Sequence, residues 1–202
     1  MSVKESSDTS ISTEDSSPIK TKLSLAEDLP KIIAHILEET IYDNEKNDKL
    51  QESKIEENDE TKMQKTQKSN KSNHLDKFTG EKIPKITLFN FLKRIIKYTN
   101  PEKSTLVICL IYLDRFHDLT CLSLNFHNIH RLLLMSALIA IKYNEDEHCT
   151  NSYFAKVGGI PDEDLNNLEE VYLKAIRYNL YINDEEYEKY ETYLNKFYIF
   201  KM

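Results

Sequence analysis

The 202-residue sequence contains little glycine, little cysteine and no tryptophan. Its three cysteines, Cys109, Cys121 and Cys149, form no CxxC pair, and their odd number argues against a disulfide scaffold. The longest apolar run lies within residues 132–141, well short of the roughly 20 residues that cross a bilayer. Because the first residues also lack the apolar core of a signal peptide, we expect an intracellular protein of the nucleus and/or cytoplasm, with no membrane partner.

Positive charge is not in excess either. The chain has 27 Lys and Arg against 34 Asp and Glu, which gives a formal net charge of -7. A protein that holds nucleic acid by its phosphates usually presents a basic face. The composition therefore predicts that no nucleic acid is a partner.

Clusters typical of metal or catalytic centres are also missing. His117, Cys121, His127 and His130 are spaced unlike any usual zinc finger, so we expect no metal and no cofactor. The acidic run 145–147 stands next to a histidine and a cysteine, but reactive partners usually meet across the fold rather than along the chain. We therefore predict no catalytic residue and no enzymatic activity.

What the chain does have is helical periodicity in two unequal parts. A polar, disordered tail (1–22) precedes a helix over 24–42, and a disordered polar insert follows over 43–77. The charges of this insert leave room for a transient helix near 46–58. From residue 78 to residue 200 the sequence is dense in apolar residues, and helical spacing recurs there with short gaps. The predicted helices cover 86–98, 104–116, 126–144, 150–156, 161–180 and 184–200. Without strand-like alternation, this pattern indicates a compact all-α domain.

Two of the three glycines, Gly158 and Gly159, are adjacent. Glycine readily takes the left-handed conformation that ends a helix, and Pro161 suits the start of the next one. A phosphate-binding loop would need GxxxxGK[ST], which the sequence lacks. We interpret the pair as a structural turn, and we expect no small-molecule ligand.

The order of four motifs carries a resemblance to a known family. YLDRF (112–116), AIKY (140–143), NSYFAKVGGI (151–160) and DLNNLE (164–169) together resemble the cyclin box, most closely that of the single-box P-type or U-type cyclins related to the yeast phosphate-pathway cyclin. The resemblance covers about 78–200 and, weakly, 24–42. It implies a five-helix cyclin box with flanking N-terminal and C-terminal helices. It also implies a non-catalytic regulatory subunit that binds and activates a cyclin-dependent kinase as a heterodimer, in the cell cycle or a nutrient response.

The same resemblance implies the residues that contact the kinase. Lys142 in AIKY and Glu169 in DLNNLE match the Lys and Glu with which cyclins contact the kinase's regulatory helix. A simpler interpretation is that the two side chains only pair with each other, and both can hold at once. Tyr143 and Phe154 are expected at the apolar centre of the contact, and Asp146 is expected to face arginines of the kinase activation segment.

Some features depart from the family or leave alternatives open. In many cyclins the Asp at the position of Asp114 in YLDRF pairs with an arginine at the start of the first box helix. This sequence has no arginine there, and only Lys85 or Arg94 could serve, so we expect Asp114 to have a structural role. Ser17 in SSPIK matches the Ser-Pro-x-Lys pattern that such kinases phosphorylate. Two other functions remain open: a helical adaptor that binds a kinase or another protein without activating it, and a transcription-factor-like module. The second would need a basic surface and usually two repeats.

Overall fold

The computed structural model describes residues 18–56 and 74–201, and for 18–27 and 51–56 it describes the helix without the side chains. This part of the chain forms seven α-helices and one short 3₁₀ helix, and it contains no strand. The elements are α1 (Pro18–Glu56), η2 (Leu75–Phe78), α2 (Leu88–Thr99), α3 (Lys103–Thr120), α4 (Ile129–Asn144), α5 (Asn151–Gly158), α6 (Asp162–Ala175) and α7 (Asp184–Lys201). The all-α prediction is confirmed.

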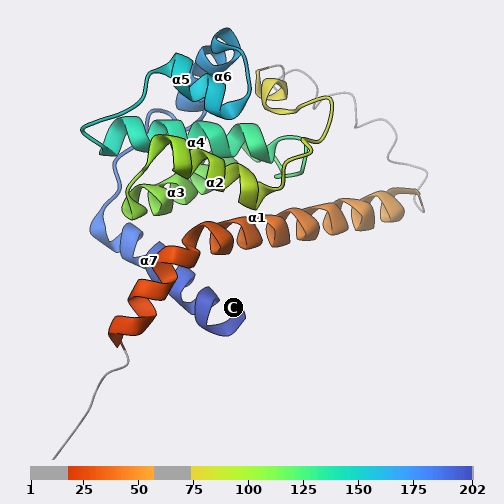
Figure 1. The fold of residues 1–202 in the computed structure, drawn as a ribbon. Helices are drawn as coiled ribbons and strands as arrows, with labels where there is room; N and C mark the ends of the chain where they lie inside the picture. Colours follow the sequence, from red (N-terminus) through yellow and green to blue (C-terminus); the bar gives the residue numbers. More distant parts are fainter. Residues whose placement is uncertain (1–17, 57–73, 202) are drawn as a thin grey trace, which may run out of the picture.

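Helices α2 to α6 form a five-helix box around α4. From Leu132 to Ile141 every residue of α4 is buried, because this stretch is apolar on all its faces except for Ser136. In Figure 1, α2 and α3 lie on one side of α4, and α5 and α6 lie on the other. No helix in the described part of the chain is both long and apolar enough to span a bilayer.

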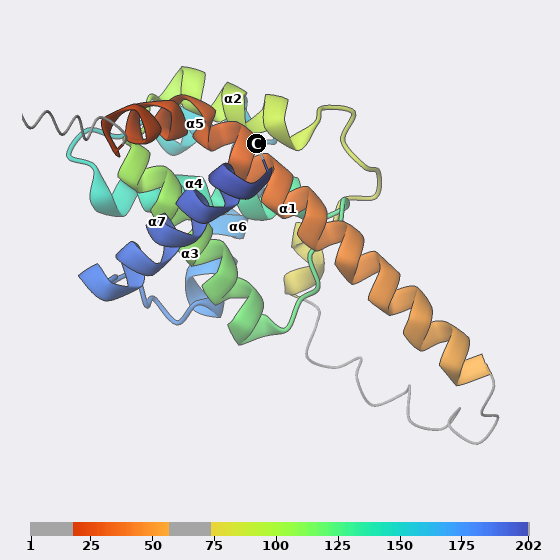
Figure 2. The same ribbon diagram turned by 90° about the horizontal axis from the view of Figure 1, so that it is seen from below.

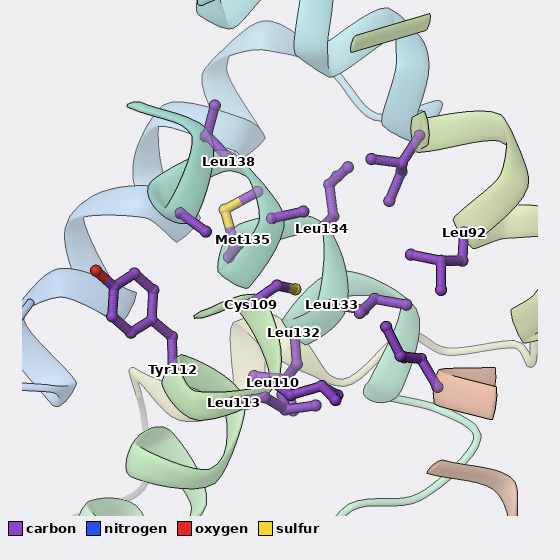
Figure 3. Packing of buried hydrophobic residues seen from close by; sticks show 14 of the residues in the cluster. Leu92, Cys109, Leu110, Tyr112, Leu113, Leu132, Leu133, Leu134, Met135 and Leu138 are labelled. Atoms are coloured by element: carbon purple, nitrogen blue, oxygen red, sulfur yellow. The ribbon is translucent and has the colours of Figure 1, made fainter. Parts of the chain in front are cut away.

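The centre of the core lies between α3 and α4. Cys109, Leu110 and Leu113 of α3 face Leu132 and Met135 of α4 (Figure 3). Burying side chains of this size stabilises a fold by about 1.5–3 kcal/mol each relative to leaving them exposed. The box is therefore held mainly by packing around α4.

A buried tyrosine connects three of the box helices. The Tyr172 hydroxyl on α6 donates a hydrogen bond to the Tyr112 carbonyl on α3 (2.9 Å), and it lies 2.5 Å from the Ser136 hydroxyl on α4. Its ring stacks on Phe116, with 4.6 Å between centroids. Burial raises the pKa of Tyr172 well above its usual value, so the group stays a neutral hydrogen-bond donor.

Helix α1 packs its apolar face against the box and then continues beyond the predicted end. Its buried side chains include most of the predicted stripe: Leu29, Ile32, Ile33, Leu37 and Ile41, with Ile36 partly buried. The helix runs from Pro18 to Glu56, so the predicted boundaries of 24 and 42 are wrong, and residues 43–56 are helical rather than part of a disordered insert. These residues carry no apolar stripe, but Lys, Glu and Gln have good helix propensity and continue an existing helix at little cost. The rest of the predicted tail (1–17) and of the insert (57–73) lies outside the described residues.

Helix α7 crosses α1 on the outside of the box (Figure 2). It is anchored by Leu194, which is 1% exposed, and by polar contacts to α3. Tyr190 donates a hydrogen bond to Asp114 (2.8 Å), and Arg115 pairs with Glu186 (2.6 Å). Asp114 is thus structural, but its partner is Tyr190 and not Lys85 or Arg94. Arg94 instead donates to the Lys156 carbonyl.

Candidate partner-binding site

The turn between α5 and α6 places the predicted site residues. Thr150 caps the start of α5, where its hydroxyl accepts from the Tyr153 N–H (3.3 Å). Gly159 ends the helix with φ of +72°, in the left-handed region. Gly158 has a different reason to be glycine, because a Cβ there would lie 2.3 Å from Leu134 Cδ2 on α4. The two glycines let α5 end close against α4, so that α6 returns beside it.

The turn brings Lys142 and Glu169 into contact across two helices. Lys142, near the end of α4, places its Nζ 2.6 Å from Glu169 Oε1 on α6. Asn151, the first residue of α5, completes the cluster: its Oδ1 accepts from Lys142 Nζ (3.2 Å), and its Nδ2 donates to Glu169 Oε2 (2.7 Å). The same amide also donates to Asn166 Oδ1 (2.7 Å). Three helices therefore meet in one hydrogen-bonded cluster.

The cluster is only partly shielded from solvent. The Lys142 side chain is 33% exposed and that of Glu169 is 15% exposed. The stem of Lys142 can stay against the apolar end of α4 while its ammonium reaches the surface. The arrangement can present a fixed positive charge, flanked by a carboxylate, to another protein.

The aromatic residues beside this cluster are not all where the sequence placed them. Tyr143 is exposed (53%), next to Lys142. Phe154 is completely buried (0% exposed), so its predicted place at a contact surface is wrong: it faces the core together with Ala155 and Val157. Tyr153, one residue earlier and 40% exposed, is the surface aromatic of α5, and its hydroxyl donates to the Tyr98 carbonyl (3.1 Å).

The acidic run after α4 separates into residues with different surroundings. Glu145 accepts the Glu102 N–H at the start of α3 (2.9 Å), so it caps a helix of its own chain. Asp146 and Glu147 are exposed. Of this run, Asp146 stays a candidate for a partner contact, and Glu145 has a structural role.

Three of the four residues considered as zinc ligands hold loops together. His117 and His127 place Nδ1 within 3.0 Å of the carbonyls of Leu122 and Gly80, and His130 places Nε2 3.0 Å from the Ile86 carbonyl. Among the described residues, no group of three or more His, Cys, Asp or Glu could hold a metal ion.

Burial raises the pKa of the Cys109 thiol to about 12, which keeps it protonated and unreactive. Ser17 lies outside the described residues.

Sequence reasoning brought Lys142 and Glu169 together but missed Asn151, Asn166 and Tyr153. Asn151 opens the NSYFAKVGGI motif, directly after a residue type that often caps helices. An asparagine in the first turn of α5, beside two charged residues expected to meet, was the available signal. Its amide can donate and accept at once, which suits it to join a lysine and a carboxylate.

A protein family and several individual proteins are similar in sequence to this chain. Residues 27–180 match the family model described as Cyclin. The chain is 40% identical over 120 residues to Cyclin-U2-1 of Arabidopsis thaliana (59% of this chain, 54% of the relative). It is 37% identical over 114 residues to Cyclin-P4-1 of Oryza sativa subsp. japonica (56% and 54%), and 37% identical over 123 residues to PHO85 cyclin-like protein psl1 of Schizosaccharomyces pombe (60% and 51%). The chain spans little more than half the length of these curated relatives.

Proposed function

The chain belongs to the cyclin family, and from this premise we propose that it is the regulatory subunit of a cyclin-dependent serine/threonine kinase, which it binds and activates inside the cell. Activation here means that the bound cyclin repositions the kinase's regulatory helix. That movement completes the Lys–Glu ion pair of the kinase and aligns its catalytic cleft. The kinase supplies all the chemistry, and this chain supplies a rigid contact surface.

The observation that carries the proposal is the partly exposed cluster of Lys142, Glu169 and Asn151. An ammonium group has three donors, and the cluster uses Lys142 Nζ for Glu169 and Asn151. A third donor remains for a carbonyl at the end of a partner helix. Because Glu169 and Asn151 fix the ammonium in place, little side-chain entropy is lost when the partner binds.

Exposed aromatic residues supply apolar area around this polar centre. Tyr143 adjoins Lys142, and Tyr153 lies on α5 close to Asn151 in the chain. Tyrosine is among the residues that dominate protein interfaces, since it buries a large ring and keeps a polar tip. Asp146 adds an exposed negative charge that suits arginines on the activation segment.

The relatives support a kinase as the partner and leave the pathway open. One relative is named a PHO85 cyclin-like protein, and the others are plant cyclins. We include in the proposal a role in the cell cycle or a nutrient response, in the nucleus and/or cytoplasm. The identity of the kinase has to come from experiment.

Affinity capture from the source cells tests the proposal. Tagged wild-type chain should retain a cyclin-dependent kinase, and the Lys142→Ala/Glu169→Ala variant should lose it. Removing a desolvated charged contact typically costs about 2–5 kcal/mol of binding free energy, enough to lose a complex on washing. The matched control is Lys174→Ala/Glu170→Ala, which removes an exposed ion pair from the same α6. This control should retain the kinase.

The captured kinase is then assayed on a short peptide substrate. Activity that rises with added wild-type chain supports a cyclin that activates. Binding without any rise in activity would instead identify an adaptor. If no kinase is captured by the wild-type chain, the proposed function is wrong. Circular dichroism of each variant shows whether a loss of capture comes from unfolding.

A further inference from the structure

Two adjoining pockets form a groove on the box that shares only Tyr153 with the proposed kinase contact. The first has a volume of about 660 Å³ and lies between η2, the start of α4 and the Gly158–Gly159 turn. The second has a volume of about 520 Å³ and lies between α2 and α5. Arg94 lines both, so the pockets adjoin at this residue. Neither is lined by Lys142 or Glu169.

The groove is strongly basic, although the chain as a whole is acidic (net charge -7). Its Lys and Arg residues are Lys77, Lys82, Arg94 and Arg131 in the first pocket, and Lys93, Lys97 and Lys156 in the second. Glu81 is the only acidic residue that lines either pocket in the described part of the chain. Such local concentration of one sign of charge in a concave surface attracts anions.

Both arginines of the first pocket are held in place by their own chain. Arg94 donates one bond to the Lys156 carbonyl (3.0 Å), and Arg131 donates one to the Lys77 carbonyl (2.6 Å). A guanidinium has five N–H donors in a fixed plane, so each arginine is oriented by one bond and has donors left. Oriented guanidinium groups bind phosphate oxygens with two parallel hydrogen bonds, which is stronger and more specific than a lysine contact.

Two further features of the first pocket favour a bound ligand. The wall at Gly158 and Gly159 has no Cβ, and a Cβ built on Gly159 would meet open space. His130 also lines the pocket, and its Nδ1 is the one buried side-chain nitrogen or oxygen among the described residues with no hydrogen-bond partner. Buried polar atoms are normally satisfied, so an unsatisfied one beside a pocket points to a missing partner. Because Nε2 donates to the Ile86 carbonyl, Nδ1 of the neutral ring is an acceptor, and the partner that it lacks is a donor such as a peptide N–H rather than a phosphate oxygen.

We infer that this groove binds an acidic peptide segment that carries a phosphorylated serine or threonine. The first pocket takes the phosphate on Arg94 and Arg131, and the second takes acidic neighbours along Lys93, Lys97 and Lys156. An extended segment fits two pockets in a row better than a small anion, which needs only one. A peptide also fits better than nucleic acid, because the net charge of the chain repels a long polyanion.

The role of this groove in a kinase complex rests on the proposed function. A bound kinase phosphorylates serine or threonine, and the groove would retain a protein that already carries one phosphate close to the catalytic cleft. Retention raises the effective concentration of the remaining sites on that protein. The groove would thus favour multisite phosphorylation without contributing to the chemistry.

Fluorescence anisotropy with the full-length chain tests the inference. The probe is a labelled peptide, Glu-Asp-Asp-pSer-Pro-Glu-Glu, compared with the same peptide without phosphate. Lys77→Glu/Lys82→Glu changes two exposed groove residues and should weaken binding of the phosphorylated probe by about tenfold or more. Lys46→Glu/Lys49→Glu makes the same change in net charge on exposed residues of α1, and it should alter binding by less than about twofold.

Each other outcome overturns the inference. Equal weakening by both variants would mean attraction to net charge alone, and equal binding of the peptide without phosphate would exclude a phosphate site. Stronger binding of a labelled single-stranded DNA oligonucleotide would assign the groove to nucleic acid. Kinase capture by Lys77→Glu/Lys82→Glu, done alongside, separates the two proposals: the variant should capture the kinase as well as wild type does, because both lysines line the first pocket, which shares no residue with the proposed kinase contact.

Discussion

Individual residues in this chain take on roles that glycine usually fills. Only three glycines are available, and within residues 18–56 and 74–201 four non-glycine residues have positive φ: Asn100, Cys121, Arg177 and Tyr178. Asn100 and Cys121 end α2 and α3 in the left-handed conformation. Such a residue costs roughly 1–2 kcal/mol in backbone energy, so packing around each of these helix ends has to offset it. Gly158 is a different case, because a side chain there would meet Leu134.

At Gly158 and Gly159, alanine should destabilise the fold for two separable reasons. Gly158→Ala places a methyl group on the buried Leu134 and should cost about 1–3 kcal/mol of overpacking, partly offset by about 1 kcal/mol of helix propensity. Gly159→Ala meets no neighbour and should cost about 1 kcal/mol, because its φ is +72°. The free energy of unfolding, from denaturant titration, measures both.

A double-mutant cycle with Leu134→Ala separates the two causes. Removing the Leu134 side chain makes room at Gly158, so Gly158→Ala and Leu134→Ala should be less than additive in their effect on stability. Gly159→Ala and Leu134→Ala should be additive, since strain at Gly159 comes from its own backbone. Additivity at Gly158 would show that Leu134 moves aside freely and that contact is not why glycine stands there.

At the level of single residues, the order of the motifs brought Lys142 and Glu169 together. The orientation of Phe154 was predicted wrongly, because periodicity could not show which side of α5 is buried. An aromatic in a short helix can face in or out, and eight residues give too little periodicity to decide between Tyr153 and Phe154. Asn151 was missed because an amide reveals its role only when the two charges that it joins are already in place.

At the level of whole helices, the sequence predicted the helices of the box well, but it did not predict where α1 begins and ends. Each of the six helices predicted beyond residue 78 corresponds to an observed one, from α2 to α7, because each has an apolar face that has to be buried. For the extension of α1 to Glu56 the sequence indicated only a transient helix near 46–58, because this stretch is stabilised by propensity and by continuity with a packed helix. Neither produces an apolar pattern.

The connection from α6 to α7 is held by side chains of α3: the Tyr112 hydroxyl donates to the Leu180 carbonyl (2.8 Å), and Arg115 makes the other hydrogen bonds. Arg115 donates to the carbonyls of Asn179 (2.7 Å) and Tyr181 (2.9 Å) and forms two bonds to Glu186 on α7 (2.6 and 3.3 Å). The strained pair Arg177 and Tyr178 directly precedes these carbonyls. Arg115 therefore holds a connection that the local backbone disfavours.

Replacing Arg115 by lysine should loosen α7 without dissolving the box. Lysine keeps the charge but presents its donors from one atom, so it cannot reach two carbonyls and a carboxylate together. We expect a loss of about 1–3 kcal/mol of stability and faster amide hydrogen exchange across Asp184–Lys201, while α4 stays protected. Arg177→Lys, at an exposed position, is the control and should leave exchange in α7 unchanged. Unchanged exchange in Arg115→Lys would show that Leu194 packing and the Tyr190–Asp114 hydrogen bond hold α7 without Arg115.

At the level of the whole molecule, α1, the box and α7 share one core. Buried residues of α1 such as Ile32 belong to the same cluster as Ile139 of α4 and Leu194 of α7. Domains of this size with one continuous core usually unfold cooperatively. A group whose protonation differs between the folded and unfolded chain therefore changes the stability of the entire molecule.

His130 should make this molecule less stable in mild acid. Burial lowers the pKa of His130 below its usual 6.5, although its bond to the Ile86 carbonyl opposes the shift. As pH falls below about 6.5, the unfolded chain takes up a proton at His130 that the folded chain does not bind, so the free energy of unfolding decreases until the pH passes the folded pKa.

Asp114 acts in the opposite direction. Burial raises its pKa although Tyr190 donates to it, so the folded chain is protonated first and gains stability as pH falls through that raised pKa.

The decisive measurement is the free energy of unfolding from about pH 8 to about pH 4, in buffers free of phosphate, for wild type and two variants. His130→Gln keeps a donor for the Ile86 carbonyl but cannot titrate, so its stability should fall less steeply than that of wild type between about pH 7 and about pH 5. Asp114→Asn removes the opposing group and should fall more steeply at the acid end. Parallel curves for His130→Gln and wild type would mean that His130 is hydrated in the folded chain. That result would also remove the unsatisfied Nδ1 as support for a ligand in the basic groove, because water would then be its partner.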